Sequence, residues 1–457
     1  MAKLKALLDD ALKETLSMHN GPFERWRKET PGAPFGPSIA AGDEFGSYQT
    51  SNRAMHALAE IADALQANDP DFDRTINQDT MRLEAATTLG ELLNDLARST
   101  DVDANWTRYK TRLAERLDRR KSRLTHYFPV WLFVGQQAPD FEVGPVKFVS
   151  PKRWVGEIER RRGQRSTWMD GVLAAWDGKP LAQDAPLAVR SVARSVHPDQ
   201  WVACGTVDGF EPAESYRRAL LATRAALDTL RLIVPATHNA RITTAADHGP
   251  PRGVDRLNQR DGEDLAHGGS INQRGVSGAP GMAESVIADS VDLREAAGRR
   301  IAGLLLADSS AAPCRELSNR WINAMHWYGR ACSDEADFAA TVNFAIALDI
   351  LCGGKMESGI LQLAARLLQI PYARLVTADG VTLKQLVHRL YGYRSEIAHG
   401  SILALDARMR TDRAQAEALA AAMLLAYAMA LDKYATAGGA DDRDRFKNAL
   451  PPAPTGP

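Results

Sequence analysis

An arginine, a hydroxyl, a carboxylate and a histidine lie within six residues of one another, as Arg394, Ser395, Glu396 and His399. Arginine binds phosphate oxygens with a planar, permanently charged fork. Histidine accepts and releases protons near neutral pH. One residue that holds a phosphate and one that moves protons are enough to cleave a phosphodiester without a metal ion. The segment is therefore a candidate catalytic site, with Arg394 and His399 as the catalytic pair.

The spacing of this pair is a weak signal by itself, because arginine is common in the chain. His399 as a helix-capping or core histidine, and Arg394 as a structural ion-pair partner, remain open alternatives. Five residues along an ideal helix rotate by about 140°, so the two side chains would not share one face unless the helix ends or bends between them. A second copy of the chain related by a two-fold axis removes this difficulty.

A carboxylate interrupts an apolar stretch upstream of this segment. Asp349 lies within the run Phe344–Leu351, which is otherwise apolar. A buried carboxylate costs free energy unless it has a cationic partner or a hydrogen-bond donor. We therefore predict an ion pair between Asp349 and Arg394.

The elements around the candidate site are predicted to be helical. Apolar residues recur at helical spacing from about residue 291 to 436, and short connections favour a compact antiparallel bundle. Gly353-Gly354 is expected to end one helix. Residues 437–457 are rich in Gly, Asp and Pro and are expected to form a disordered tail. The predicted helices are Leu293–Leu306, Arg315–Cys332, Asp337–Cys352, Ile360–Leu368, Leu383–Tyr391 and Arg413–Lys433.

The preceding part of the chain divides into two predicted regions. Residues 1–125 have helical periodicity, with one predicted helix running to Leu124. Residues 126–290 contain aromatic and β-branched segments, including a hairpin around Gly144-Pro145, and predict a middle domain with a small sheet. The expected fold class is α+β, mainly α, with the helical bundle last.

Bulk properties narrow the classes of function. The chain has 457 residues and a net charge of −1, so no global basic field attracts nucleic acid. A basic segment, Arg108–Arg123, is interrupted by acids and reads better as a solvated helix face than as an RNA-binding patch. No Cys-x-x-Cys pair, signal peptide or long apolar run is present, and we expect a cytoplasmic protein with no metal, no cofactor and no membrane span.

The C-terminal part resembles the HEPN superfamily of helical bundles, in its Apea-like branch. Tyr391, Arg394, Ser395, Ile397, His399 and Gly400 match the branch's Tyr-x-x-Arg-Ser-x-Ile-x-His-Gly signature. The helix Arg320–Tyr328 is similar to the family's Arg-x-x-x-Ala-x-x-Trp-Tyr helix. Ala347-Leu348-Asp349 stands where the family usually has Ala-Leu-Glu. The likeness covers about residues 313–436.

The resemblance implies a metal-independent endoribonuclease that leaves 2′,3′-cyclic phosphate and 5′-hydroxyl ends. In it, His399 would act as general acid or base, and Arg394 would hold the scissile phosphate. Ser395, Glu396, Asp349 and Tyr391 would be supporting residues. The family pairs through this bundle, so the partners implied are RNA and a second copy of the chain.

The same analogy suggests a toxin or an antiphage defence effector, with the N-terminal region answering to a phage-derived or small-molecule trigger. The rival interpretation is a non-catalytic HEPN module that binds nucleotides or partners, or that serves only for dimerisation.

Overall fold

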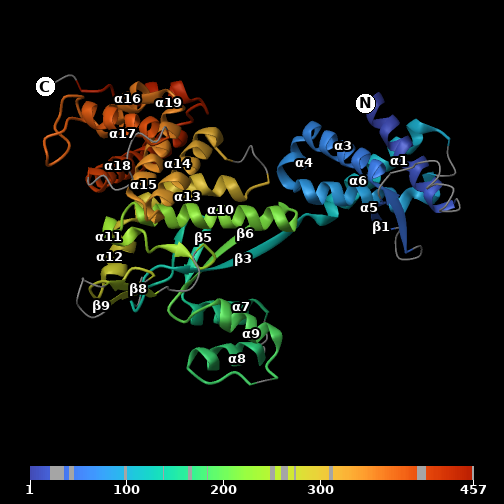
Figure 1. Cartoon of the computed structure of the whole chain (residues 1–457), viewed down its shortest axis with the longest axis horizontal. Coiled ribbons are helices and arrows are strands. Elements are labelled where there is room, and N and C mark those ends of the chain that lie inside the picture. Colours follow the sequence, from blue (N-terminus) through green and yellow to red (C-terminus); the bar gives the residue numbers. More distant parts are fainter. Residues whose placement is uncertain are drawn as a thin grey trace. The chain divides into compact units, whose positions relative to one another are not determined.

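The fold is described from a computed structural model (Figure 1). The structure describes residues 1–20, 35–40, 46–96, 100–136, 138–162, 167–182, 184–247, 253–258, 266–271, 274–307, 312–398 and 408–454. It is mainly helical with small sheets, which confirms the predicted α+β, mainly α class. The chain forms two compact units. Unit 1 comprises Met1–Leu124 and Val207–Arg217, and unit 2 comprises Thr125–Thr206 and Arg218–Pro457.

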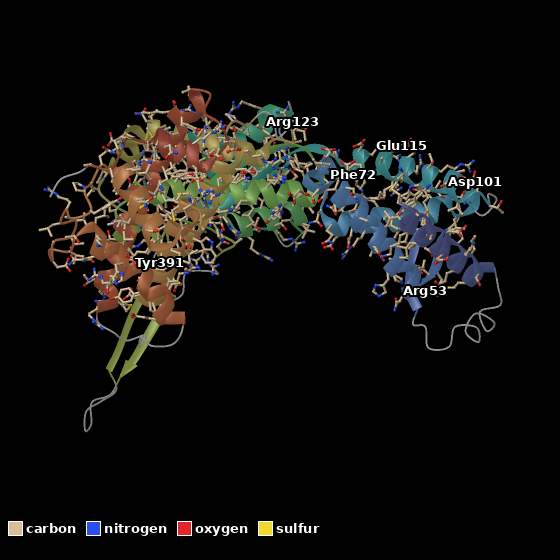
Figure 2. The ribbon with its side chains drawn as sticks, turned by 90° about the horizontal axis from the view of Figure 1, so that it is seen from above. Arg53, Phe72, Asp101, Glu115, Arg123 and Tyr391 are labelled. Atoms are coloured by element: carbon tan, nitrogen blue, oxygen red, sulfur yellow. The ribbon has the colours of Figure 1, made fainter. Side chains whose placement is uncertain are left out.

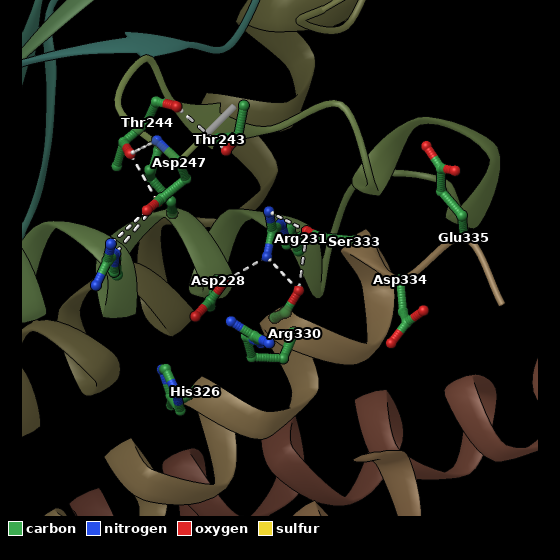
Figure 3. A pocket seen from close by; sticks show the side chains of 13 residues that line it. Asp228, Arg231, Thr243, Thr244, Asp247, His326, Arg330, Ser333, Asp334 and Glu335 are labelled. Carbon is green, nitrogen blue, oxygen red and sulfur yellow. Dashed lines mark hydrogen bonds and ion pairs between the residues drawn. The ribbon is translucent and has the colours of Figure 1, made fainter. Parts of the chain in front are cut away.

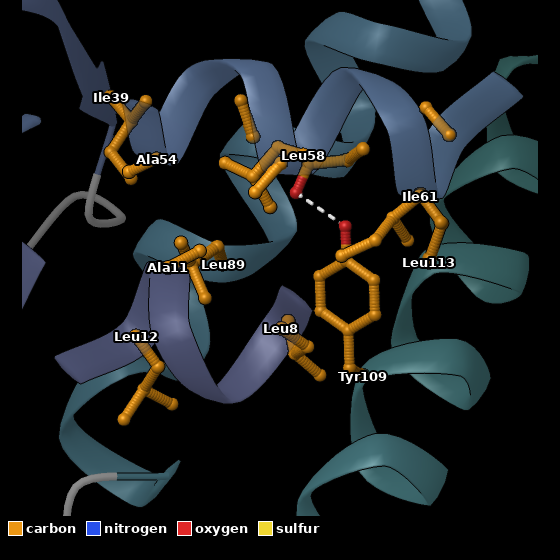
Figure 4. Packing of buried hydrophobic residues seen from close by; sticks show 14 of the residues in the cluster. Leu8, Ala11, Leu12, Ile39, Ala54, Leu58, Ile61, Leu89, Tyr109 and Leu113 are labelled. Carbon is orange, nitrogen blue, oxygen red and sulfur yellow. Dashed lines mark hydrogen bonds between the residues drawn. The ribbon is translucent and has the colours of Figure 1, made fainter. Parts of the chain in front are cut away.

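Unit 1 is a group of helices with a two-stranded hairpin. Apolar faces of its helices meet in one core, where Leu8, Leu58 and Leu89 are buried around Tyr109 (Figure 4). The Tyr109 hydroxyl donates a hydrogen bond of 2.9 Å to the carbonyl of Ala85, which satisfies its buried polar atom. The elements are α1 (Ala2–Asn20), β1 (Phe35–Ala40), β2 (Ser47–Ser51), α3 (Asn52–Asn68), α4 (Pro70–Thr75), α5 (Gln78–Leu96) and α6 (Val102–Arg120).

Helix α6 begins and ends at residues with clear physical roles. The side chain of Asp101 accepts hydrogen bonds from the backbone N–H groups of Asp103 and Ala104, and so caps the helix. Figure 2 shows Asp101 at this end and Glu115 further along the same helix. The backbone becomes extended at Lys121 and enters a strand at Ser122. The prediction of a helix to Leu124 is therefore wrong, because the residues that follow, including Thr125 and Tyr127, favour a strand.

The basic segment of α6 is largely neutralised within unit 1. Glu84 is 1% exposed and lies 2.7 Å from Arg116 Nε and 2.5 Å from Arg120 Nη2. Arg116 also pairs with Glu91, and Arg112 pairs with Glu91 and Glu115. These acids hold the guanidinium groups that an RNA backbone would need, which agrees with the interpretation of Arg108–Arg123 as an ordinary helix face.

Unit 2 is built around a five-stranded sheet in the order β4-β5-β6-β3-β7. The hairpin predicted around Gly144-Pro145 is confirmed, with Glu142 opposite Lys147 in an antiparallel pair. Ala219 of the long helix α10 lies against Gly205 of the sheet, 3.8 Å from where a Cβ would stand. The strands and this helix are β3 (Ser122–Trp131), β4 (Phe141–Val143), β5 (Val146–Val149), β6 (Trp201–Phe210), β7 (Thr243–Thr244) and α10 (Pro212–Arg231).

Several short elements of unit 2 were not predicted individually. Three helices pack around Trp154, Met169 and Val196 in a small core that also includes Val149 and Val202 of the sheet. Two short strands pair as an antiparallel ladder from Gly253↔Ile271 to Asn258↔Ala266. The elements are α7 (Pro151–Arg162), α8 (Thr167–Trp176), α9 (Leu187–Ser195), α11 (Ala236–Asn239), β8 (Gly253–Asn258), β9 (Ala266–Ile271) and α12 (Met282–Asp289).

The C-terminal helices of unit 2 form a bundle in which α14 lies at the core. Trp321 is fully buried and donates a hydrogen bond of 3.0 Å to the carbonyl of Leu424, while Tyr328 packs against Phe344. The apolar composition of α18 would suffice to cross a membrane, yet its buried residues pack within this bundle. The helices are α13 (Val291–Leu305), α14 (Arg315–Ser333), α15 (Asp337–Cys352), α16 (Met356–Leu368), α17 (Leu383–Ala398) and α18 (Arg408–Thr436).

The tail is ordered by one aromatic anchor, so the prediction of disorder across residues 437–457 is wrong for most of it. Helix α19 (Arg443–Ala449) is capped by the side chain of Asp442. Phe446 is 1% exposed, with its ring centroid 5.0 Å from that of Tyr427 and 5.2 Å from that of Tyr434. A single large apolar side chain outweighs the polar composition from which disorder was predicted.

The turn of the β4–β5 hairpin touches a helix backbone to backbone. A Cβ on Gly144 would overlap the main chain of Gly298 in α13, and a Cβ on Gly298 would overlap that of Gly144. Gly144 also has a φ of 58°. Two glycines facing each other therefore allow the sheet and the bundle to meet here.

Replacing Phe446 with alanine should destabilise the protein by about 3–5 kcal/mol, because it removes a buried aromatic side chain and leaves a cavity. Chemical denaturation of Phe446→Ala measures the loss. Asn448→Ala, an exposed position on the same helix, should change the free energy of unfolding by less than about 0.5 kcal/mol. Equal stability of the two variants would contradict docking of the tail.

Candidate functional site

A regular apolar stripe on α17 sets the direction of Arg394. Leu383, Leu386, Val387 and Leu390 are all buried and recur at helical spacing. Arg394 comes four residues after Leu390 and so continues the same face. The guanidinium therefore lies where the buried stripe reaches the surface, on a helix held in place by packing.

The ion pair predicted from the sequence is confirmed. Nη1 of Arg394 donates a hydrogen bond of 3.0 Å to Oδ2 of Asp349, which lies on the neighbouring helix α15. The Arg394 side chain is 43% exposed, whereas that of Asp349 is only 15% exposed. The carboxylate thus anchors the arginine from inside the bundle, and the rest of the guanidinium faces outward.

A thiol supports the same carboxylate. Sγ of Cys352 lies 3.7 Å from Oδ1 of Asp349 and 3.2 Å from the carbonyl of that residue. Burial, with the carboxylate nearby, raises the pKa of Cys352 to about 11, so the sulfur keeps its proton and acts as a donor. Arg394 is therefore the main donor to the Asp349 carboxylate, and the single thiol proton of Cys352 serves either the carboxylate or the nearer carbonyl.

The C-terminal end of α15 is held by cations. Gly353 adopts the left-handed conformation and closes the helix, as predicted, with its N–H directed to the carbonyl of Ile350. Arg320 donates to that carbonyl at 3.3 Å, and Arg443 of the tail donates to the carbonyl of Gly353 at 3.3 Å. Positive charge at a helix C-terminus complements its dipole, so the helix that carries Asp349 is fixed at its end.

A second polar network begins at Tyr393, the residue that precedes Arg394. The Tyr393 hydroxyl donates a hydrogen bond of 2.7 Å to Oδ2 of Asp412, on α18. Asp412 is 3% exposed, and its Oδ1 lies 3.1 Å from Nε of Arg389. Burial and the bond to Asp412 raise the pKa of Tyr393 to about 12. Together the two networks tie α17 to α15 and to α18.

The structure places only part of the predicted site. Arg394, Tyr391 and Glu396 lie on α17, with Tyr391 half-buried (Figure 2) and Glu396 exposed. The side chain of Ser395 lies outside the described residues, as do His399 and Gly400. Of the six predicted site residues, the structure brings Arg394 and Asp349 into contact.

Among the described residues, the other histidines form no cluster suited to a metal ion. His388 on α17 lies 3.0 Å from Glu357 and is exposed, and His238 lies in α11. Over the part of the chain that the structure describes, no group of three or more His, Cys, Asp or Glu side chains has the geometry of a metal site. All four cysteines are buried and unpaired with one another.

Asp412 and Arg389 were missed by the sequence analysis. Asp412 lies between two arginines in a run of polar residues, Arg410-Thr411-Asp412-Arg413, where nothing distinguishes a buried acid from an exposed one. Arg389 and Tyr393 are four residues apart and so lie on one face of α17. Their spacing indicates a shared partner only once α18, which carries Asp412, is known to pack against that face.

Comparisons with protein-family models, with curated protein sequences and with solved structures gave no match to this chain. The function proposed below therefore rests on the residues, on the geometry of those that the structure describes, and on the resemblance drawn from the sequence.

Removing either member of the Arg394–Asp349 pair should cost unequal amounts of stability. Arg394→Met leaves a carboxylate that is largely shielded from water, whereas Asp349→Asn leaves a guanidinium that water can reach. We expect the first variant to lose about 1–3 kcal/mol and the second to lose less. The coupling energy in a double-mutant cycle should be at most about 1 kcal/mol, as for a partly exposed pair. A larger loss of unfolding free energy for Asp349→Asn than for Arg394→Met would contradict this prediction.

Ionisation of the Tyr393 hydroxyl should lower the stability of the protein at alkaline pH. Its folded pKa of about 12 lies above the reference value of 10.0, so its contribution is complete below pH 10 and is lost as pH rises toward 12. The stability advantage of the wild type over Tyr393→Phe should therefore narrow across this range. Denaturation at successive pH values measures it. Tyr372→Phe, at a 39% exposed position, serves as the control and should show a constant difference.

Proposed function

We propose that this protein is a metal-independent endoribonuclease of the HEPN type. The observation that carries the proposal is the anchored, outward-facing guanidinium of Arg394, five residues before His399 in the sequence. Asp349 takes one of its nitrogens, and the described residues offer no other partner to the group. The free N–H donors suit the two oxygens of a phosphodiester.

The reaction would need no activated water in its first step. His399 acts as general base for the ribose 2′-hydroxyl or as general acid for the leaving 5′-oxygen. The 2′-oxygen attacks phosphorus, the bond to the 5′-oxygen breaks, and the products carry a 2′,3′-cyclic phosphate and a 5′-hydroxyl. Arg394 stabilises the charge on the phosphate oxygens during the transfer. Asp349 orients Arg394, and Ser395, Glu396 and Tyr391 are supporting residues.

A complete reaction needs both an acid and a base, and each chain supplies one His399. A homodimer in which two copies of α17 face one cleft would supply both. The proposed active form is thus a dimer acting on RNA in the cytoplasm, without a metal or cofactor. Its use as a toxin or an antiphage effector rests on the HEPN resemblance alone.

The test compares wild type, Arg394→Ala and His399→Ala on total RNA in the presence of EDTA. We expect cleavage by the wild type and a loss of at least about 100-fold in both variants. His388→Ala and Arg374→Ala remove exposed residues of the same types and should retain activity. The new 3′ ends should resist ligation to a 5′-phosphorylated adaptor until the cyclic phosphate is opened and the resulting monophosphate is removed.

Two results would argue against the proposal. Cleavage that EDTA abolishes would indicate a metal-dependent enzyme. Equal inertness of the wild type and both variants, with RNA still bound, would favour the non-catalytic binding module.

A further inference from the structure

A polar pocket in unit 2 lies away from Arg394 and Asp349. It has a volume of about 540 Å³ and is lined by residues of α10, of β7 with the turn that follows it, and of the C-terminal half of α14 (Figure 3). Ligand pockets of proteins commonly span about 300–1,000 Å³. Its lining residues lie between positions 224 and 335, so it shares no residue with the site proposed above.

The floor of the pocket is built from a buried ion pair. Nη1 of Arg231 donates to Oδ1 of Asp228 and to the carbonyl of Gly329, each at 2.7 Å. Its other nitrogens donate to the carbonyl of Ile242 and to Oγ of Ser333. Arg231 is thus fully engaged within the protein and forms a rigid base, not a free anion receptor.

One wall of the pocket carries two arginines, Arg224 and Arg330, together with the carboxylate of Asp247. Arg224 is half-buried, and its Nε and Nη2 both donate to Asp247, with Nε 3.2 Å from Oδ2. His326 and Arg330 lie on successive turns of α14. Burial, with Arg224 and Arg330 nearby, lowers the pKa of His326 although Asp247 opposes the shift, so its ring is neutral at pH 7. The surroundings of His326 therefore disfavour protonation of its imidazole ring.

Arg330 is the exposed arginine of this wall that no carboxylate among the described residues engages. An exposed arginine beside a second arginine and a neutral imidazole suits an anion that accepts several hydrogen bonds. Asp334 and Glu335 line another side of the same pocket, away from His326 in Figure 3, and present acceptors.

We propose that this pocket binds a small phosphate ester with hydrogen-bond donors at its other end, the chemistry of a nucleoside monophosphate. Arg330 holds the phosphate, Arg224 adds its Nη1, the nitrogen that does not donate to Asp247, and His326 contributes a ring N–H. Asp334 and Glu335 accept hydrogen bonds from hydroxyl or amino groups of the ligand. The proposal does not depend on ribonuclease activity, because the two sites are separate.

The experiment is a calorimetric titration of the full-length protein with AMP, at low ionic strength. We expect saturable binding that weakens as salt is added, and no detectable binding of adenosine, which lacks the anion. Arg330→Gln should weaken binding by at least about tenfold, since it removes a charge-assisted hydrogen bond. Arg374→Gln, which removes an exposed arginine elsewhere, should bind AMP as the wild type does.

Circular dichroism and thermal unfolding serve to check that Arg330→Gln keeps its fold, which its exposed position predicts. Absence of AMP binding by the wild type would overturn the proposal. So would binding that neither Arg330→Gln nor Arg224→Gln weakens. Citrate binding without AMP binding would overturn the assignment of a phosphate ester, and equal affinity for inorganic phosphate and AMP would overturn the assigned role of Asp334 and Glu335.

Discussion

The buried guanidinium of Arg231 joins three elements of unit 2 through its hydrogen bonds. It lies at the end of α10, faces Asp228 on the same helix, and donates to carbonyls that precede β7 and that belong to α14. A buried pair of this kind is costly to break, because removing one partner leaves an uncompensated charge. Gly329 makes the contact possible, since any side chain there would overlap the Asp228 carboxylate.

A chain of contacts connects Arg231 with the candidate catalytic residue Arg394. Helix α14 carries Gly329 at one end and Arg320 near the other, where Arg320 binds the last turn of α15. Asp349 lies on that last turn and holds Arg394. The direction in which Arg394 points is therefore set by three helices, and not by its own helix alone.

Sequence reasoning succeeded where the determining signal is local. The apolar stripe of α17 and the hairpin around Gly144-Pro145 follow from periodicity and turn chemistry. The Asp349–Arg394 pair followed from the cost of a carboxylate within an apolar helix. The first two depend only on neighbouring residues, and the third depends on a cation elsewhere in the same bundle.

Sequence reasoning failed where the deciding contact leaves no mark on the residues around it. Composition indicated a disordered tail, because it does not register that Phe446 finds a site between Tyr427 and Tyr434. The bounds of α6 depended on the strand into which its end continues. The charged pocket of α10 and α14 could not be foreseen, because Arg224 and Arg330 are brought together only by the packing of two helices.

The contact between Gly144 and Gly298 has a consequence for how this chain can change over evolutionary time. Most close contacts in a core can be altered by an exchange, in which one residue grows while its neighbour shrinks. No such exchange exists here, because both residues are already the smallest one available. Neither glycine can be replaced while the two backbones stay in contact. Substitution at either position therefore requires the whole β4–β5 hairpin to move away from α13.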